Sequence, residues 1–441
     1  MKLVMQLSDL FGRQIKEQEV PESLITNSAC HSFSAFTRRG QNVICVRCGS
    51  QINKQETKLA IDHFYCANCL QMGRLTSSDN LITINEPNQF NYTGSCQWQG
   101  VLTNDQRNCA KQVIASIDKR IDRLLWAVTG AGKTEMLFPG LEHAFRQQLR
   151  VAVVSPRIDV ILELAPRLRT AFPDVTSCLL YGKTTEKYSY TQLVIATVHQ
   201  LLRFYHAFDV LIIDEVDVFP LAGNKQLHYA IQRAKKVTSS VIYLTATPDT
   251  TLKQQVKATK LAVSYLPRRF HGFPLATITN VKVGNWRARL TQRKLPPQLV
   301  TAIEQRIIKQ QPFLLFVPHI ADLKLVSEIL KPRLNLPIIT VHAKDPKRVD
   351  KVRQMRNKET LFLVTTTILE RGVTFPLIDV LVLGADDDIF SAAALIQIAG
   401  RVGRNVKRPS GDVYFYLHKR TNAIKQAQRE IKMMNKKAGF K

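Results

Sequence analysis

The sequence contains no continuous run of the about 18–20 apolar residues that a membrane-spanning helix needs. Residues 1–13 also lack the apolar segment and small-residue cleavage site of a secretory signal peptide. Acidic residues are scarce, because 35 Asp and Glu stand against 62 Lys and Arg, and the formal net charge is +27. These features predict a chain without a membrane span that acts on a polyanion, either nucleic acid or an anionic membrane surface.

Short repeats and low-complexity tracts are also absent, while hydrophobic residues make up 45% of the chain and charged residues 22%. This composition excludes a disordered or fibrous protein and allows a large hydrophobic core. The length of 441 residues predicts about three domains, or two large ones with an added module.

Four of the eight cysteines form two Cys-x₂-Cys pairs, Cys45 with Cys48 and Cys66 with Cys69. Residues 49–65 separate the pairs, a spacing typical of structural tetrathiolate zinc sites, with buried or redox-active cysteines as the alternative. We therefore predict one Zn²⁺ bound by these four thiolates. Weaker alternative ligands are Cys30, His31 and His63, and the other cysteines, expected to pack as small hydrophobic residues, are Cys96, Cys109 and Cys178.

Short apolar runs alternate with longer amphipathic stretches after residue 94. Runs that are apolar on both faces and separated by helix-length segments are typical of buried parallel strands. The sequence therefore predicts an α/β protein with two successive parallel sheets. The strands expected in the first sheet are Leu124–Val128, Val151–Val154, Leu193–Ala196, Val210–Ile213 and Val241–Leu244. Those expected in the second are Phe313–Val317, Ile338–Val341, Leu361–Val364, Val380–Leu383 and Val413–Tyr416.

This pattern divides the chain into five parts. Residues 1–40 show little periodicity and are interpreted as a lead-in, and residues 41–93 form the cysteine module. The first α/β domain spans residues 94–267, and a linker with Pro and Gly breakers spans residues 268–295. The second α/β domain spans residues 296–441 and ends in a basic tail, interpreted as a fraying helix.

A glycine-rich loop, Ala-Val-Thr-Gly-Ala-Gly-Lys-Thr at residues 127–134, follows the first predicted strand and precedes a helical stretch, which is the setting of a P-loop. Lys133 is expected to reach the β- and γ-phosphates of ATP, and the Thr134 hydroxyl to ligate Mg²⁺. Ala127 replaces the first glycine of the strict pattern, a change that a strand end tolerates. The expected ATP-binding residues of the loop are Thr129, Gly130, Ala131, Gly132, Lys133 and Thr134.

The apolar strand at residues 210–213 ends in Asp214 and Glu215. An apolar strand ending in acids is common by itself, but downstream of a P-loop it indicates the second half of an ATP site. We predict that Asp214 holds Mg²⁺ through its water shell and that Glu215 deprotonates the attacking water.

These motifs, with six others in order, resemble those of superfamily 2 helicases and translocases. The resemblance implies two RecA-like domains, with Gln106 reading adenine and Gln397 at the nucleotide. The other motifs are LTNDQ (102–106, Q motif), VSPR (154–157, Ia), ATVHQ (196–200, Ib), TAT (245–247, III), TTTILERG (365–372, V) and QIAGRVGR (397–404, VI). The implied nucleic-acid contacts are Pro156, Arg157, Thr197, His199 and Thr366, although His199 is equally compatible with a packed strand-end histidine.

Two such domains facing each other across a cleft need a positive charge from the second domain for the γ-phosphate. Arg401 and Arg404 fit this role, because three-residue spacing at a helix start places them on one face, with a solvated helix face as the alternative. ATP binding would close the cleft and hydrolysis would reopen it, which would move the two domains along a strand.

The cysteine module in front of the motor, with Asp-Glu-Val-Asp-Val-Phe-Pro at residues 214–220, resembles the late-competence DNA-uptake ATPase family, ComFA. The resemblance covers about residues 43–404. It implies an ATP-driven single-stranded DNA motor, peripheral to the inner face of the cell membrane. The expected partners are single-stranded DNA, a competence membrane channel and cytosolic competence proteins.

Three alternatives stay open. A replication-restart helicase also binds zinc, but its cysteine cluster lies inside the second motor domain. An RNA helicase has Asp-Glu-Ala-Asp as its motif II, where this sequence has Asp-Glu-Val-Asp at residues 214–217. A non-catalytic DNA-binding scaffold would have lost ATP-site residues, which are intact in this sequence.

Overall fold

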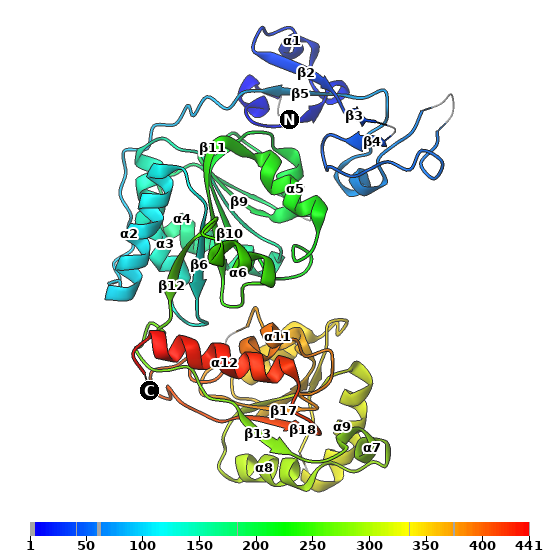
Figure 1. The fold of residues 1–441 in the computed structure, drawn as a ribbon, viewed down its shortest axis with the longest axis vertical. Helices are drawn as coiled ribbons and strands as arrows, with labels where there is room; N and C mark the ends of the chain where they lie inside the picture. The colour runs from blue at the N-terminus through cyan, green and yellow to red at the C-terminus, as the bar shows by residue number, and fades with distance from the viewer. Residues whose placement is uncertain are drawn as a thin grey trace. The chain divides into compact units, whose positions relative to one another are not determined.

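The computed structural model describes residues 5–40, 42–59, 63–182, 184–334, 336–373 and 375–440. These residues divide into two compact units (Figure 1). The first comprises residues 1–126 and 133–265, and the second comprises residues 127–132 and 266–441.

The centre of the first unit is a seven-stranded sheet in the order β12-β6-β11-β10-β7-β9-β8. The pairs from β6 through to β8 are all parallel. The structure confirms the five strands predicted here and adds β8 and β12. Their bounds are β6 (Arg123–Ala127), β7 (Val151–Ser155), β8 (Ser177–Leu180), β9 (Leu193–Thr197), β10 (Phe208–Asp214), β11 (Lys235–Thr245) and β12 (Ala262–Leu266).

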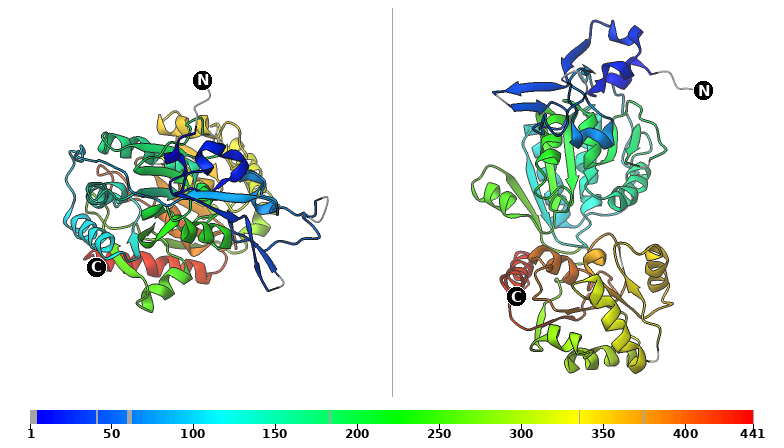
Figure 2. Two further views of the ribbon diagram at one scale, coloured as in Figure 1. Left: turned by 90° about the horizontal axis from the view of Figure 1, so that it is seen from above. Right: turned by 90° about the vertical axis from the view of Figure 1, so that its right-hand side faces the viewer.

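Helices cover both faces of this sheet (Figures 1 and 2). The connections through α3 and α4 run toward β8, whereas α5 connects β10 back to β11, so right-handed crossovers place α5 on the opposite face. The helices are α2 (Asn104–Lys119), α3 (Lys133–Arg146), α4 (Ile158–Ala171), η4 (Val198–Arg203), α5 (Lys225–Ala234) and α6 (Thr250–Lys257).

The first forty residues, for which the sequence predicted no regular elements, contribute strands. A three-stranded sheet has the order β1-β5-β2, and its strand β5 comes from the far side of the cysteine module. Leu10, Ile15 and Ile82 form its buried core. The lead-in and the end of the module therefore fold together. The elements are η1 (Leu7–Leu10), β1 (Ile15–Lys16), η2 (Glu17–Glu19), α1 (Glu22–Ile25), β2 (Cys30–Ser34), the hairpin β3 (Phe36–Arg39) and β4 (Asn42–Cys45), η3 (Ala67–Met72) and β5 (Asn80–Ile84).

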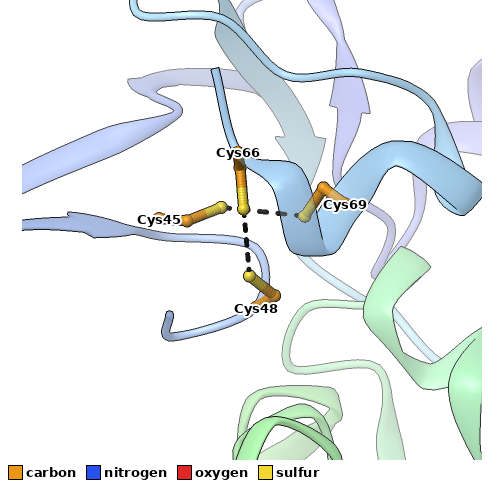
Figure 3. A group of neighbouring side chains, drawn as sticks. All are labelled: Cys45, Cys48, Cys66 and Cys69. Carbon is orange, nitrogen blue, oxygen red and sulfur yellow. Dashed lines mark hydrogen bonds between the residues drawn. The ribbon is translucent and has the colours of Figure 1, made fainter. Parts of the chain in front are cut away.

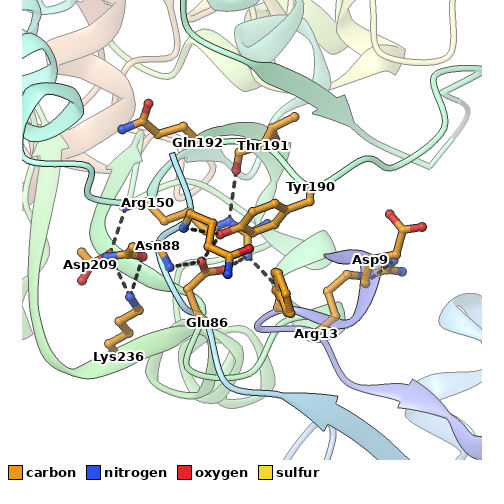
Figure 4. Close-up of polar contacts among 12 residues, drawn as sticks. Asp9, Arg13, Glu86, Asn88, Arg150, Tyr190, Thr191, Gln192, Asp209 and Lys236 are labelled. Carbon is orange, nitrogen blue, oxygen red and sulfur yellow. Dashed lines mark hydrogen bonds and ion pairs between the residues drawn. The ribbon is translucent and has the colours of Figure 1, made fainter. Parts of the chain in front are cut away.

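A buried arginine, Arg150, ties this N-terminal region to the large sheet (Figure 4). Its guanidinium donates to the carbonyl of Phe11 at 3.0 Å and to the carboxylate of Glu86. It also donates to the Tyr188 hydroxyl at 2.7 Å, and its backbone N–H donates to Asp209 at 3.0 Å. Because each contact compensates a buried charge or polar group, separating the two parts would leave Arg150 unsatisfied.

The second unit contains a six-stranded parallel sheet in the order β13-β18-β17-β14-β16-β15. The structure confirms the five strands predicted here. The segment interpreted as a linker, residues 268–295, differs: it holds β13 and α7, and Trp286 and Leu290 of α7 belong to the core of this unit. The elements are β13 (Thr279–Lys282), α7 (Trp286–Thr291), α8 (Pro297–Ile308), β14 (Phe313–Phe316), α9 (Ile320–Leu334), β15 (Thr340–Val341), α10 (Arg348–Arg356), β16 (Phe362–Thr365), η5 (Thr367–Leu369), β17 (Asp379–Leu383), α11 (Ala392–Ala399), β18 (Val413–Leu417) and α12 (Asn422–Lys437).

The basic tail is the docked helix α12, not a fraying one. Ile424, Ile431 and Met434 are buried on its apolar face. Asn435 accepts from the backbone N–H of Leu275 at 2.8 Å and donates to its carbonyl at 3.1 Å. Across the described residues, no helix has both the length and the apolar character needed to cross a membrane.

Candidate functional site

The predicted motifs of the first domain gather at one edge of its sheet. The strands β6, β7, β9, β10 and β11 are parallel, so their carboxyl ends share this edge. The strands end at Ala127, Ser155, Thr197, Asp214 and Thr245, and each end leads into or carries a motif. The sheet therefore brings together side chains from five separate segments.

The glycine-rich loop has the backbone conformation that a phosphate cradle needs. Gly130 and Gly132 have φ angles of 76° and 70°, in the left-handed region that glycine adopts without strain. Lys133 begins α3, with Thr134 in its first turn, so the helix N-terminus faces the loop. The Lys133 Nζ lies 3.5 Å from Asp214 Oδ1. These residues fit a magnesium–nucleotide phosphate group.

Glu215 follows Asp214 at a sharp turn. Its φ is 55°, unusual for a residue with a side chain, and its backbone N–H donates to Asp214 Oδ1 at 2.9 Å. The Arg157 Nε lies 4.0 Å from Glu215 Oε2, and the same guanidinium bonds Asp159 at 3.0 Å. Arg157, predicted to contact nucleic acid, is thus held beside the predicted general base.

The structure reveals a link between motifs II and III that the sequence did not assign. The carboxylate of Asp217 accepts hydrogen bonds from the hydroxyls of Thr245 and Thr247, the latter at 2.6 Å. Thr245 also accepts from the backbone N–H of Thr247 at 2.9 Å. The sequence does contain a signal for this link, because a carboxylate and two hydroxyls follow or end two strands that are neighbours in the sheet. Through these hydrogen bonds, Asp217 connects the turn after β10 to the end of β11 and the turn that follows it.

Gln106, predicted to read adenine, forms part of a helix cap. It is buried at the N-terminus of α2, where its Oε1 accepts from the backbone N–H of Thr103 at 2.8 Å. Its own N–H donates to the Thr103 hydroxyl at 3.3 Å, which completes a capping box. Its role at adenine stays a prediction.

Three of the predicted nucleic-acid contacts line one cavity of about 490 Å³: Pro156, Thr197 and His199. Burial lowers the pKa of His199, which favours the neutral imidazole. The fourth, Arg157, points to Glu215 as described. Thr366 lies in the second unit, buried at the start of η5.

Arg401 and Arg404 do not lie at a helix start, so the predicted helical position of these two arginines is wrong. Their role at the γ-phosphate stays a prediction. The helix α11 ends at Ala399, and both arginines follow its C-terminus. Arg401 is buried and donates to the carbonyls of Glu370, at 3.0 Å, and Val373. Arg404 Nε donates to the Gly400 carbonyl at 2.9 Å. The buried Gln397 lies within α11 itself.

The four predicted zinc ligands form a buried cluster with their sulfur atoms directed toward one another (Figure 3). All four Sγ atoms lie within 4.8 Å of each other, with Cys45–Cys69 at 3.8 Å and Cys48–Cys66 at 3.5 Å. Tetrahedral zinc with Zn–S bonds of about 2.3 Å requires sulfur separations of about 3.8 Å. The cluster therefore fits one Zn²⁺.

Arg47 fastens the second cysteine pair. Its Nε donates to Cys69 Sγ at 3.3 Å, and its Nη atoms donate to the carbonyls of Cys69 and Met72, each at 3.3 Å. Hydrogen bonding from Cys45, with a smaller effect of the Arg47 charge, lowers the pKa of Cys69. The weaker candidate ligands lie outside the cluster: Cys30 Sγ contacts the Leu24 carbonyl at 3.1 Å, and His63 pairs with Ser77. His31 is exposed on β2, Cys109 and Cys178 are buried, and Cys96 is half-buried.

Three family models match the chain. The Competence protein ComFA N-terminal domain matches residues 3–83, which include the lead-in and the cysteine cluster. The DEAD/DEAH box helicase model matches residues 103–255, and the Helicase conserved C-terminal domain matches residues 297–406. The N-terminal region and the two helicase-type domains are therefore each matched by a family model of their own.

Among solved structures, Mss116p bound to ssRNA and AMP-PNP has a TM-score of 0.53 at 18% identity, covering 73% of this chain and 70% of that chain. The Mycobacterium smegmatis helicase Lhr bound to ssDNA and AMP-PNP has a TM-score of 0.51 at 17% identity, covering 75% of this chain and 50% of that chain. These likenesses show the tandem RecA-like fold.

Two relatives match nearly end to end. Competence protein ComFA of Bacillus subtilis (strain 168) is 39% identical over 432 residues, covering 97% of this chain and 92% of that protein. Competence protein ComFA of Streptococcus pneumoniae (strain ATCC BAA-255 / R6) is 38% identical over 436 residues, covering 98% of this chain and 99% of that protein. The chain therefore belongs to the competence protein ComFA family and is an ATP-hydrolysing enzyme of the superfamily 2 helicase type.

Proposed function

We propose that this ATPase is a single-stranded DNA translocase that draws transforming DNA into the cell during natural competence. The observation that carries the proposal is the 38–39% identity to two competence proteins over nearly the full length of the chain, cysteine module included. The net charge of +27 supports a polyanionic substrate.

The hydrolytic step rests on residues of the first domain. Lys133 would hold the β- and γ-phosphates, and Thr134 and Asp214 would hold Mg²⁺, which would neutralise phosphate charge. Glu215 takes the proton from the attacking water, with the Arg157 guanidinium 4.0 Å from its carboxylate. Asp217 links this site to motif III through Thr245 and Thr247.

Arg404 supplies positive charge to the transition state, and Arg401 orders motif V through its carbonyl contacts. We expect Arg404→Ala to lower the ATP turnover number about 100-fold while changing ATP affinity much less, because the charge acts chiefly on the transition state. Steady-state ATPase kinetics and binding of a fluorescent ATP analogue separate the two quantities. Equal losses in both would make Arg404 a ground-state ligand or a structural residue.

Salt dependence tests the nature of DNA binding. Phosphate contacts release counterions, so the logarithm of the association constant should fall with the logarithm of salt concentration with a slope of about −0.7 for each single-strand phosphate contacted. We also expect little base preference. Fluorescence anisotropy with labelled oligothymidylate in increasing KCl measures the slope. An affinity that hardly changes between low and physiological salt would contradict electrostatic binding.

ATPase rates with single-stranded DNA, duplex DNA and RNA, measured in parallel, test the substrate class. The proposal requires the largest stimulation from single-stranded DNA. RNA as the strongest activator would favour the RNA helicase alternative.

In the host, we propose action beside the membrane channel together with cytosolic competence proteins. Deleting the gene should lower uptake of external DNA and leave growth normal. Slow growth with normal transformation would instead favour a replication-restart helicase.

A further inference from the structure

The cavity beside motifs Ia and Ib is completed by the N-terminal region. One side is formed by motif residues of the first RecA-like domain and the other by the lead-in and the cysteine module. The six residues that define the two sides are Pro156, Thr197, His199, Arg13, Gln71 and Met72. A nucleic-acid strand bound along motifs Ia and Ib would therefore contact the N-terminal region next.

The two sides are held together by direct backbone pairing. Arg13 forms a bridge with Phe204, immediately after η4 of motif Ib. The N–H of Gln14 donates to the Arg203 carbonyl at 3.0 Å, and its side chain donates to the Leu202 carbonyl at 2.9 Å. On the module side, Arg47 bonds the carbonyls of Cys69 and Met72, which fixes the turn that carries Gln71. The cavity is thus built from ordered elements.

The cavity is lined by two positively charged side chains, Arg13 and Arg203. The carboxylates of Asp9 and Glu19 favour the charged forms of Arg13 and Arg203, respectively, but neither carboxylate forms a salt bridge with them among the described residues. Neither Arg13 nor Arg203 forms a salt bridge within the described part of the chain, and the buried Arg13 Nε has no hydrogen-bond partner there. Arg13 stacks over the Tyr188 ring at 4.0 Å, and its guanidinium donates to the backbone carbonyl of Asp9 at 3.3 Å (Figure 4). The lining carboxylate, Glu186, is already neutralised by Arg169 at 2.9 Å.

Burial and mutual repulsion act on this pair of arginines. Burial lowers the pKa of Arg13, and Arg203 lowers it further. Burial also lowers the pKa of Arg203, with Arg47 of the cysteine module adding to the effect. The two guanidinium groups that line the cavity, Arg13 and Arg203, repel each other, and a bound anion would relieve this repulsion. The open volume and the exposed edge at Gln71 admit a chain rather than a single ion.

We propose that this cavity is a strand-binding subsite in which Arg13 and Arg203 contact consecutive phosphates of single-stranded DNA that has passed motifs Ia and Ib. The half-buried ring of Tyr181, which lines the same cavity, stacks on a base. The strand path therefore continues from the motor onto the cysteine module. This inference rests on the proposed function, because it extends the path of the same DNA.

The test compares full-length Arg13→Gln, Arg203→Gln and Tyr181→Ala with a matched charge-loss control, Arg146→Gln. Arg146 lies on α3 in an exposed pair with Glu142, away from the cavity. The probe is fluorescein-labelled oligothymidylate, titrated in increasing KCl. We expect Arg13→Gln and Arg203→Gln each to lower the affinity for the oligonucleotide about tenfold and to reduce the magnitude of the salt slope by about 0.7. The control variant should change neither quantity.

Further readouts separate contact from damage. A variant is compared with wild type in DNA binding only if its zinc content and thermal unfolding midpoint match those of wild type. Tyr181→Phe, which keeps the ring, should restore the affinity lost in Tyr181→Ala. Photocross-linking with 5-iodo-deoxyuridine oligonucleotides, followed by peptide mapping, should label Tyr181 in wild type.

The outcomes distinguish the inference from the proposed function. If wild type binds single-stranded DNA but the folded arginine variants bind with unchanged affinity and slope, the subsite is absent and the translocase proposal stands. If wild type neither binds single-stranded DNA nor is stimulated by it, the proposed function fails together with the subsite.

Discussion

Glu215→Gln should lower the rate of ATP hydrolysis by about 1,000-fold, the range expected when a positioned general base is removed. The amide keeps the shape of the carboxylate but cannot accept the proton of the attacking water. Asp214 and Lys133 remain, with the Lys133 Nζ 3.5 Å from Asp214, so the phosphate and metal site survives. Binding of ATP should therefore stay close to wild type, as measured with a fluorescent nucleotide analogue and Mg²⁺.

The matched variant is Lys133→Ala, which should abolish hydrolysis and weaken nucleotide binding together. The difference arises because the lysine charge contacts the phosphates already in the ground state. Turnover near wild type in Glu215→Gln would exclude it as the base. The neighbouring Arg157 would then need another explanation for its position 4.0 Å from this carboxylate.

Buried parallel strands were the part of the fold most accessible from sequence. The run Val151–Val154 is apolar on both faces because both faces are covered, and that requirement is visible locally. The P-loop and the acids after β10 were placed correctly at strand ends for the same reason. All the ends of one parallel sheet lie at one edge, so a motif at a strand end has a defined location.

The N-terminal sheet was missed because its pairing is long-range. Strand β1 spans only Ile15–Lys16, too short for any periodicity, and its partner β5 begins at Asn80. Strand β2 has no fully buried residue and is mostly exposed, so its sequence shows no clear apolar alternation. Nothing local to residues 1–40 indicates that residues beyond the cysteines complete their sheet.

Motif VI shows how a helix boundary can be misplaced. Ser391 caps α11 by accepting from the N–H of Ala394 at 3.1 Å, which starts the helix well before Gln397. The helix then ends at Ala399, with Gly400 as its C-cap, before either arginine. A serine followed by three alanines was a readable start signal. Its consequence is that Arg401 turns back to the carbonyls of motif V, a contact that spacing alone could not predict.

Replacing Cys48 and Cys69 with alanine should release the bound zinc and disorder the cysteine module. Structural zinc contributes about 10–16 kcal/mol of apparent binding free energy in small zinc domains, far more than this short module can recover by other contacts. Each of the two sulfur pairs, at 3.5 and 3.8 Å, would lose one member, and two remaining thiolates are too few to hold the predicted ion. Metal analysis of protein purified under reducing conditions should show one zinc in wild type and none in the variant. Cys96→Ala, which removes a half-buried thiol outside the cluster, should keep its zinc.

The functional consequence follows from what the module holds in place. Arg47 bonds Cys69, and through it positions the turn at Gln71 and Met72, while Tyr229 of α5 donates to the Val46 carbonyl at 2.9 Å. The RecA-like sheets have separate cores, so basal ATPase activity should persist after zinc loss. DNA affinity and transformation of the host should fall, because the part of the proposed DNA-binding cavity that the cysteine module forms would be disordered. A variant that lacks zinc yet transforms normally would make the module dispensable for DNA handling. Absence of zinc from the wild-type protein would show that the prediction of a zinc site at the four cysteines is wrong.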